Sequence, residues 1–176
     1  MELVLQWLYV LGLLTLLGVA AVVVARQVWR TRITETRLSQ LQQQVTRGQA
    51  SPADYYELGS IYLRKKLYVQ CINQLQKALK LWDEQDAAGL AKVYNALGYA
   101  YFSQEQYDLA IRQYREALKL QPDYVTAMNN LGHAYEKKQL TAQALAMYEQ
   151  VLQIAPENPT AKQRAHALRK RLAPTA

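Results

Sequence analysis

The chain has 176 residues, with 21 Lys and Arg against 14 Asp and Glu, so its formal net charge at pH 7 is +7. The excess lies at the ends: residues 26–50 carry five Arg and one Glu, residues 159–176 carry five basic residues and no acid, and residues 51–158 carry 11 basic and 12 acidic residues. A nucleic-acid-binding domain gathers Lys and Arg on one face of its folded body, so this distribution argues against nucleic acid as a partner. One cysteine, Cys71, excludes an internal disulfide framework and a multi-cysteine metal site.

Residues 1–25 are predicted to form a membrane-spanning anchor. No charged residue lies between Leu3 and Ala25, and a run of this length is sufficient to cross about 30 Å of hydrocarbon as a helix. A cleaved signal peptide is the alternative, and it requires a basic region before an apolar core of about 7–15 residues. Here Glu2 is the charged side chain before the core, and the core is longer, so we expect an uncleaved anchor.

Basic residues follow the predicted span. Arg26, Arg30, Arg32 and Arg37 come after it, and no Lys or Arg precedes it. Because basic flanking residues stay on the cytoplasmic side of a membrane, we expect residues 26–176 to lie in the cytoplasm or its organellar equivalent. The same arginines could attract anionic lipid headgroups, but topology alone accounts for them.

Residues 26–50 are polar and rich in Gln, and they are predicted to form a helical stalk or linker. Ile33, Leu38, Leu41 and Val45 are spaced as one stripe of a short helix that ends at Gly48. A coiled-coil dimer stem is the alternative, although fewer than two heptads are available for it.

One pattern recurs three times between residues 51 and 157. An aromatic residue or Met is followed three positions later by Leu-Gly, and Tyr comes three positions after the Gly. The copies are Tyr55-x2-Leu58-Gly59-x2-Tyr62, Tyr94-x2-Leu97-Gly98-x2-Tyr101 and Met128-x2-Leu131-Gly132-x2-Tyr135. Gly98 and Gly132 are 34 residues apart, whereas Gly59 and Gly98 are 39 apart, so five extra residues lie near residues 86–90.

Further positions repeat in phase with these glycines. A small residue follows each Gly by twelve positions and a bulky one by sixteen: Cys71, Ala110 and Ala144, then Leu75, Tyr114 and Tyr148. Pro122 and Pro156 close the second and third copies, because Pro cannot continue a helix. This combination is the signature of the tetratricopeptide repeat (TPR), a pair of antiparallel helices that approach most closely at the small residues.

The predicted helix pairs lie at about 52–66 and 69–83, 89–104 and 107–120, and 124–138 and 141–154, in units of about 52–85, 91–124 and 125–158. Asn158-Pro159 opens a seventh helix that should cover the apolar face of the last unit, so residues 158–176 are predicted to form a capping helix and basic tail. The predicted fold class is therefore all-α: an N-terminal transmembrane helix followed by a three-repeat TPR superhelix with a C-terminal capping helix.

The sequence holds no catalytic constellation. His133 and His166 are the only histidines, Cys71 occupies a slot that normally holds Ala, and no Gly-rich phosphate loop or nucleophile motif occurs. We therefore expect no enzyme activity, no catalytic, cofactor-binding or metal-binding residues, no cofactor and no small-molecule substrate. A soluble enzyme or regulator with a cleaved leader is disfavoured by the shape of the apolar segment.

What remains is a protein-binding groove. In a TPR stack the first helix of each unit lines the concave face, and aromatic rings with interspersed amides suit an extended peptide. The predicted groove residues are Tyr56, Arg64, Lys92, Asn95, Tyr99, Phe102, Asn129, His133 and Lys137. TPR adaptors that grip chaperone C-termini carry Lys and Arg at fixed groove positions. Here those positions hold Tyr56, Ser60, Ala96, Thr126 and Asn130, so a chaperone carboxylate clamp is not expected.

A narrower resemblance covers nearly the full chain. The layout, with its five-residue insertion and single anchor, resembles the membrane-anchored TPR proteins of cyanobacteria and plastids that assist photosystem I assembly. The stretches that carry it are Leu81-Trp82-Asp83-Glu84-Gln85-Asp86, Gln106-Tyr107-Asp108-Leu109-Ala110-Ile111 and Met128-Asn129-Asn130-Leu131-Gly132-His133-Ala134-Tyr135-Glu136-Lys137-Lys138.

This resemblance implies an assembly factor in the thylakoid membrane, single-pass, with its TPR domain on the cytoplasmic or stromal side. Its partners would be protein clients, namely photosystem I subunits or assembly intermediates, which it would bind through the concave groove. The alternative is a general bacterial membrane-anchored TPR adaptor in envelope assembly or secretion.

Overall fold

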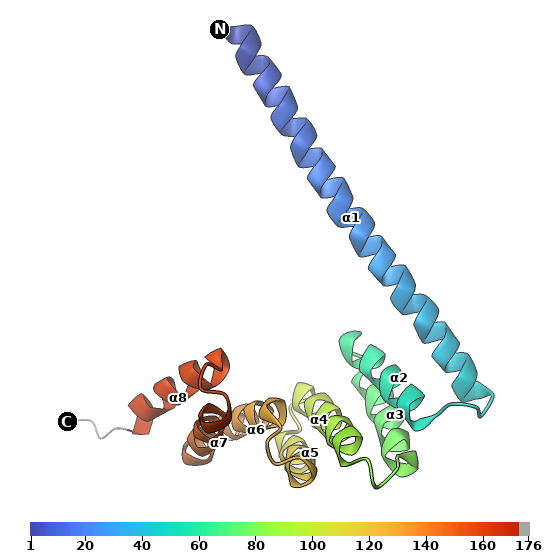
Figure 1. Ribbon diagram of the computed structural model, residues 1–176, viewed down its shortest axis with the longest axis vertical. Helices are drawn as coiled ribbons and strands as arrows, with labels where there is room; N and C mark the ends of the chain where they lie inside the picture. Colours follow the sequence, from blue (N-terminus) through green and yellow to red (C-terminus); the bar gives the residue numbers. More distant parts are fainter. Residues whose placement is uncertain (173–176) are drawn as a thin grey trace.

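The computed structural model describes residues 1–172, apart from the side chains of residues 2–5 and 8–10. Residues 173–176 of the predicted basic tail lie outside the described part. Within it the chain forms eight helices and no strand (Figure 1), so the all-α prediction is confirmed. The helices are α1 (Glu2–Thr46), α2 (Pro52–Arg64), α3 (Tyr68–Leu81), α4 (Ala87–Ser103), α5 (Tyr107–Leu120), α6 (Val125–Lys137), α7 (Thr141–Ile154) and α8 (Pro159–Leu172).

Helix α1 is one continuous helix of 45 residues that projects away from the other seven (Figure 1). It includes both the predicted anchor and most of the predicted stalk without a break. The part from Leu11 to Thr46 is long and apolar enough to cross a membrane, and its apolar window is not buried against the rest of the protein. A soluble helix would bury such side chains, so their exposure on α1 is what a lipid-facing segment requires.

Helices α2 to α7 form three consecutive antiparallel pairs, and α8 packs on α7 (Figure 1). Each helix begins and ends close to its predicted residue. Ser51 caps α2: its hydroxyl accepts from the Asp54 N–H, and the Asp54 carboxylate accepts from the Ser51 N–H. Asn158 caps α8 in a similar way, because its side-chain oxygen accepts from the Ala161 N–H at 2.9 Å.

Small and bulky residues meet inside each pair, as the repeat predicts. A Cβ added at Gly98 would lie 2.6 Å from Cε1 of Tyr114, and one added at Gly132 would lie 2.9 Å from Cζ of Tyr148. Both tyrosines are almost completely buried. The absence of a side chain at each glycine therefore allows the ring of the facing helix to lie directly against the backbone.

The five-residue insertion lengthens the first helix of the second unit. Helix α4 has 17 residues, whereas α2 and α6 have 13. Its added start is capped by the Asp86 carboxylate, which accepts from the Gly89 N–H at 2.8 Å and from Trp82 Nε1 at 2.9 Å. These two donors hold the pKa of Asp86 below its usual value. The insertion is thus folded into a capped helical turn.

The end of α1 packs against α2, which turns back along it (Figure 1). Leu38 and Leu41 of α1 and Leu58 and Ile61 of α2 are buried together, with Val45 at the edge. We call this contact the α1–α2 seam. Three of the four residues in the predicted stripe therefore pack on the TPR stack, whereas Ile33 is 57% exposed. Within one chain, α2 already covers the two leucines that a coiled-coil dimer would need.

Two charged pairs flank the seam. Arg37 donates to both carboxylate oxygens of Glu57, at 2.8 and 2.5 Å, and lies 3.8 Å from Asp54. Lys65 forms an ion pair with Glu35. The hydrogen bond from Arg37 lowers the pKa of Glu57, and the bonds from Ser51, with Arg37 nearby, lower the pKa of Asp54.

A first prediction concerns the contact of Gly98 with Tyr114. Gly98→Leu should lower the free energy of unfolding by about 1–3 kcal/mol or more, because the new side chain enters a filled space. The control is Ala142→Leu, which enlarges an exposed position on α7. The measurement is denaturant unfolding followed by circular dichroism. Equal stability of the two variants would show that the repeat phase is misassigned.

A second prediction concerns pH. Because the pKa values of Glu57 and Asp54 are lowered in the folded state, their contribution is present above their ordinary values of about 4.3 and 3.9 and is lost as pH falls through the lower folded values. Hydrogen-exchange protection of residues 38–46 should therefore fall severalfold between pH 6 and pH 3. Glu57→Gln should lower protection already at pH 6 and flatten this dependence. A dependence unchanged by Glu57→Gln would contradict the assignment.

Candidate functional site

The predicted groove residues come from α2, α4 and α6, and the structure divides them into packed and exposed groups. Asn95 of α4 and Asn130 of α6 form a link between two units, because Asn130 Nδ2 donates to Asn95 Oδ1 at 2.9 Å. Tyr124, just before α6, is half-buried, and burial raises its pKa. One hydrogen-bonding group of Asn95 therefore links neighbouring repeats and is not available to a partner.

Aromatic contacts hold three further groove residues in place. The ring of Tyr56 meets that of Trp82 edge to face, with centroids 6.1 Å apart. The ring centroid of Phe102 lies 4.8 Å from that of His133 and 5.3 Å from that of Tyr107. Burial and the nearby charge of Arg164 lower the pKa of His133, so its imidazole is neutral at pH 7. The side chains of Tyr56, Phe102 and His133 therefore pack against neighbouring rings, and they shape the surface more than they offer free contacts to a partner.

The exposed group contains Tyr99, Lys92 and Lys137. Tyr99 is 47% exposed although it is large and mostly apolar. Asn129, one turn of α6 before His133, is half-buried, and its Oδ1 has no hydrogen-bond partner among the described residues. The Oδ1 of Asn129 is itself buried, so Tyr99 is the residue of this pair that offers a contact surface without rearrangement.

Arg64 lies elsewhere. It ends α2 and lines a hollow of about 400 Å³ between α1 and α2, together with Arg30 and Lys65. The sequence alone gives no sign of this hollow, because it depends on the angle at which α1 leaves the stack.

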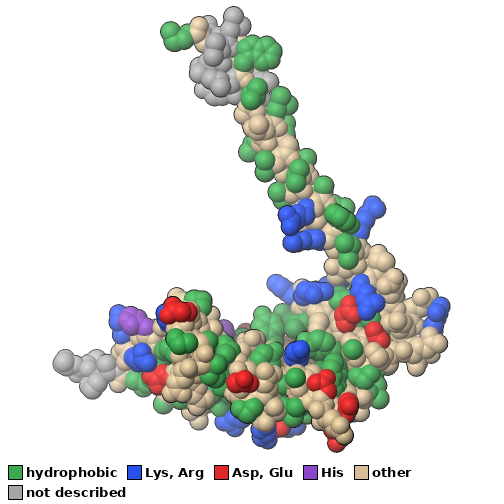
Figure 2. All heavy atoms as spheres, viewed as in Figure 1, with side chains coloured by type: hydrophobic (Ala, Val, Ile, Leu, Met, Phe, Trp, Pro, Cys, Tyr) green, Lys and Arg blue, Asp and Glu red, His purple; other side chains and the backbone are tan. Residues whose placement is uncertain are grey.

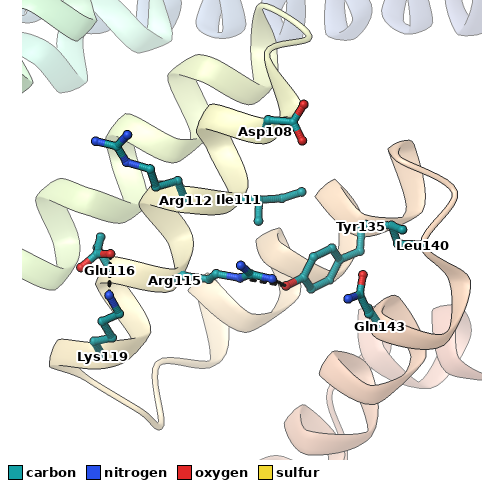
Figure 3. A pocket seen from close by; sticks show the side chains of 9 residues that line it. All are labelled: Asp108, Ile111, Arg112, Arg115, Glu116, Lys119, Tyr135, Leu140 and Gln143. Atoms are coloured by element: carbon teal, nitrogen blue, oxygen red, sulfur yellow. Dashed lines mark hydrogen bonds and ion pairs between the residues drawn. The ribbon is translucent and has the colours of Figure 1, made fainter.

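A second hollow, of about 530 Å³, lies between α5 and the α6–α7 pair (Figure 3). Arg115 of α5 joins the two walls: it donates to the hydroxyl of Tyr135 on α6 at 2.8 and 3.1 Å and lies over its ring. Lys119 pairs with Glu116 at 2.7 Å. The lining residues are Asp108, Ile111, Arg112, Arg115, Glu116, Lys119, Tyr135, Leu140 and Gln143.

This α5–α7 hollow was not predicted. It continues into a shallower one of about 380 Å³ that shares Arg115, Lys119 and Tyr135 and adds Met128 and Met147. Exposed Arg, Lys and Glu on a second helix are typical of a solvated face, so the sequence offered no signal. Both hollows are open and mixed in character, a form suited to a protein surface rather than to an enclosed small ligand.

Groups suited to catalysis are not brought together in the described residues. No three of their His, Cys, Asp and Glu side chains could hold a metal ion. Cys71 is fully buried, and burial raises the pKa of its thiol to about 12. A thiol that stays protonated in the core is neither a nucleophile nor a metal ligand at neutral pH.

Comparisons with known proteins agree with this architecture. A sequence model described as "TPR repeat" matches residues 98–139, and one described as "Tetratricopeptide repeat" matches residues 125–158. The uncharacterized protein ycf37 of Guillardia theta is 40% identical over 130 residues, which cover 74% of this chain and 73% of that protein. The chloroplastic TPR domain-containing protein PYG7 of Arabidopsis thaliana is 46% identical over 129 residues, 73% of this chain but 42% of that protein.

Among solved structures, the first TPR of Spaghetti (RPAP3), bound to the HSP90 peptide SRMEEVD, superposes with a TM-score of 0.64. It is 22% identical, and the match covers 70% of this chain and 94% of that one. This likeness concerns the fold alone, because at this identity the residues that contact the peptide need not correspond.

Proposed function

The chain belongs to the Ycf37 family of TPR proteins, and we propose that it is a non-enzymatic, membrane-anchored scaffold that binds a segment of a client protein. TPR domains bind protein partners, and the RPAP3 neighbour does so with a peptide. The observation that carries the proposal is the exposure of Tyr99 on α4, a helix that packs against α5 and α3. A half-exposed aromatic ring on a rigid surface gains free energy when a partner covers it.

The proposed contact surface is the concave face that α2, α4 and α6 are expected to line. Tyr99 would supply the apolar contact at its centre, and Asn129, whose Oδ1 would first have to be uncovered, would supply an amide for the backbone of the client. Lys92 and Lys137, both exposed, would lie at its margins. The packed residues Tyr56, Asn95, Phe102 and His133 would hold this surface in shape.

We propose that the client is a photosystem I subunit or assembly intermediate and that the chain lies in the thylakoid membrane. The support is the resemblance of the repeats, the insertion and the anchor to photosystem I assembly proteins, together with the chloroplastic relative. Arg26, Arg30 and Arg32 after the apolar segment support a TPR domain on the stromal or cytoplasmic side.

The third prediction tests this surface. Tyr99→Ala with Asn129→Ala should reduce co-purification of photosystem I subunits from mild-detergent membranes by more than tenfold, because truncation of a central aromatic often costs about 2 kcal/mol of binding. The domain should melt near its usual temperature, since Tyr99 is 47% exposed.

The matched control is Arg112→Gln with Lys119→Gln, which alters the α5–α7 hollow and should retain the client. Loss of the client from this control alone would move the binding surface to that hollow. Recovery of envelope or secretion components in place of photosystem I subunits would overturn the client assignment while leaving the scaffold.

A further inference from the structure

The end of α2 and the facing part of α1 line a basic hollow beside the apolar part of α1, and we call this hollow the cradle. The hollow of about 400 Å³ at this place is lined by Gln27, Arg30, Thr31, Thr34, Glu35, Arg64 and Lys65. Figure 2 shows Lys and Arg side chains on α1 below its apolar part and on the stack beneath it. The two walls come from segments about 35 residues apart in the chain, which are brought together because α2 turns back along α1.

The charge in the cradle is only partly balanced. Glu35 is the one acidic lining residue, and it is paired with Lys65. Arg30 and Arg64 are exposed, and neither takes part in an ion pair among the described residues. Two guanidinium groups with free donors thus face one small hollow, an arrangement that favours a phosphate or sulfate group.

An apolar stripe continues from this cradle along α1. A shallow hollow there is lined by Val22, Ala25, Arg26, Trp29, Arg30 and Ile33, so it shares Arg30 with the cradle. Trp29 is 69% exposed. A basic site that adjoins an exposed stripe of Val, Ala, Trp and Ile combines the two requirements of a lipid, a charged headgroup and an acyl chain.

The side of the cradle nearest the membrane, at Arg30, lies at the depth of a lipid headgroup. The uncharged run ends at Ala25, and a helix rises about 1.5 Å per residue, so Arg30 lies about 7.5 Å beyond the hydrocarbon. Glu35, with its partner Lys65, lies about 15 Å beyond it, on the solvent side of the headgroups. The headgroup layer is about 5–8 Å thick on each side of a core of about 30 Å. An acidic segment of a client has no reason to prefer this depth, whereas a lipid phosphate or sulfonate is always present there.

We propose that Arg30 and Arg64 of the cradle bind the headgroup of an anionic membrane lipid whose acyl chain lies along α1 from Trp29 toward Val22. The inference rests on the proposed membrane anchoring but not on the identity of the client. The lipid fills the angle between α1 and the stack and so supports the orientation of the TPR domain at the membrane surface.

The fourth prediction uses the full chain in a mild neutral detergent, titrated with dioleoyl phosphatidylglycerol or dioleoyl phosphatidylcholine and followed by native mass spectrometry. We expect the anionic lipid to bind about tenfold more tightly than the zwitterionic one. Arg30→Gln with Arg64→Gln should abolish this preference. Lys170→Gln with Arg171→Gln, which removes the same charge from exposed positions on α8, should keep it.

Arg30→Lys with Arg64→Lys, which keeps the charge but removes the guanidinium donors, should retain part of the preference. An unchanged circular-dichroism melt of the Gln variant would separate loss of binding from loss of folding. No preference in the unmodified chain, or equal loss in the α8 control, would overturn the proposal. Displacement of the lipid by sodium sulfate beyond that by sodium chloride of equal ionic strength would show a site for free anions instead. Release of the chain from membranes by alkaline carbonate would overturn the anchoring itself, whereas retention without lipid preference would overturn the lipid site alone.

Discussion

The α1–α2 seam is the contact on which the arrangement of the molecule depends. Leu41 is fully buried and Leu38 nearly so, and burial of a Leu side chain contributes about 1.5–3 kcal/mol. Because α1 continues as one helix from this seam through its apolar part, the seam fixes the direction of that part relative to the TPR stack (Figure 1). A flexible linker in place of the stalk would leave the two free to rotate, and the cradle at Arg30 and Arg64 would not persist.

The seam also closes one end of a repeat array. Each repeat buries its apolar face against a neighbour, so both ends of a stack need a cover. At the N-terminal end the cover is the last part of α1, and at the C-terminal end it is α8, through Ala161, Ala165 and Leu168. The sequence correctly predicted α8 as a capping helix, but it predicted the last part of α1 as a stalk and not as the cover of the first repeat. With both ends covered, the exposed Tyr99 lies on a surface that neither end helix covers.

Much of the fold could be predicted because its signals are local and repeated. Gly98 and Gly132 at a period of 34, with Tyr114 and Tyr148 sixteen positions later, define the helix pairs and their closest approach. The helical stripe of Leu38 and Leu41 was also visible. The helix against which this stripe packs could not be predicted, because a stripe of this length fits a neighbouring helix of the same chain as well as a helix of a second chain.

The candidate site was less predictable, for a physical reason. Whether a surface residue is free depends on side chains far away in sequence: Asn95 is engaged by Asn130, and Phe102 by His133. Position in the repeat predicts the helix face but not these contacts. The α5–α7 hollow and the basic cradle depend on spaces between helices, which no single segment encodes.

The most direct test of the seam is a distance measurement in the membrane. Spin labels would be attached at Arg32→Cys on α1 and Lys80→Cys on α3, both exposed positions, in a chain with Cys71→Ala, since Ala fills the equivalent slot at Ala110 and Ala144. In lipid nanodiscs, pulsed electron paramagnetic resonance should give one narrow distance distribution that broadens when Leu38→Ala and Leu41→Ala are added. A broad distribution in the chain with an intact seam would show that α1 does not hold the TPR domain in one orientation and would contradict the account.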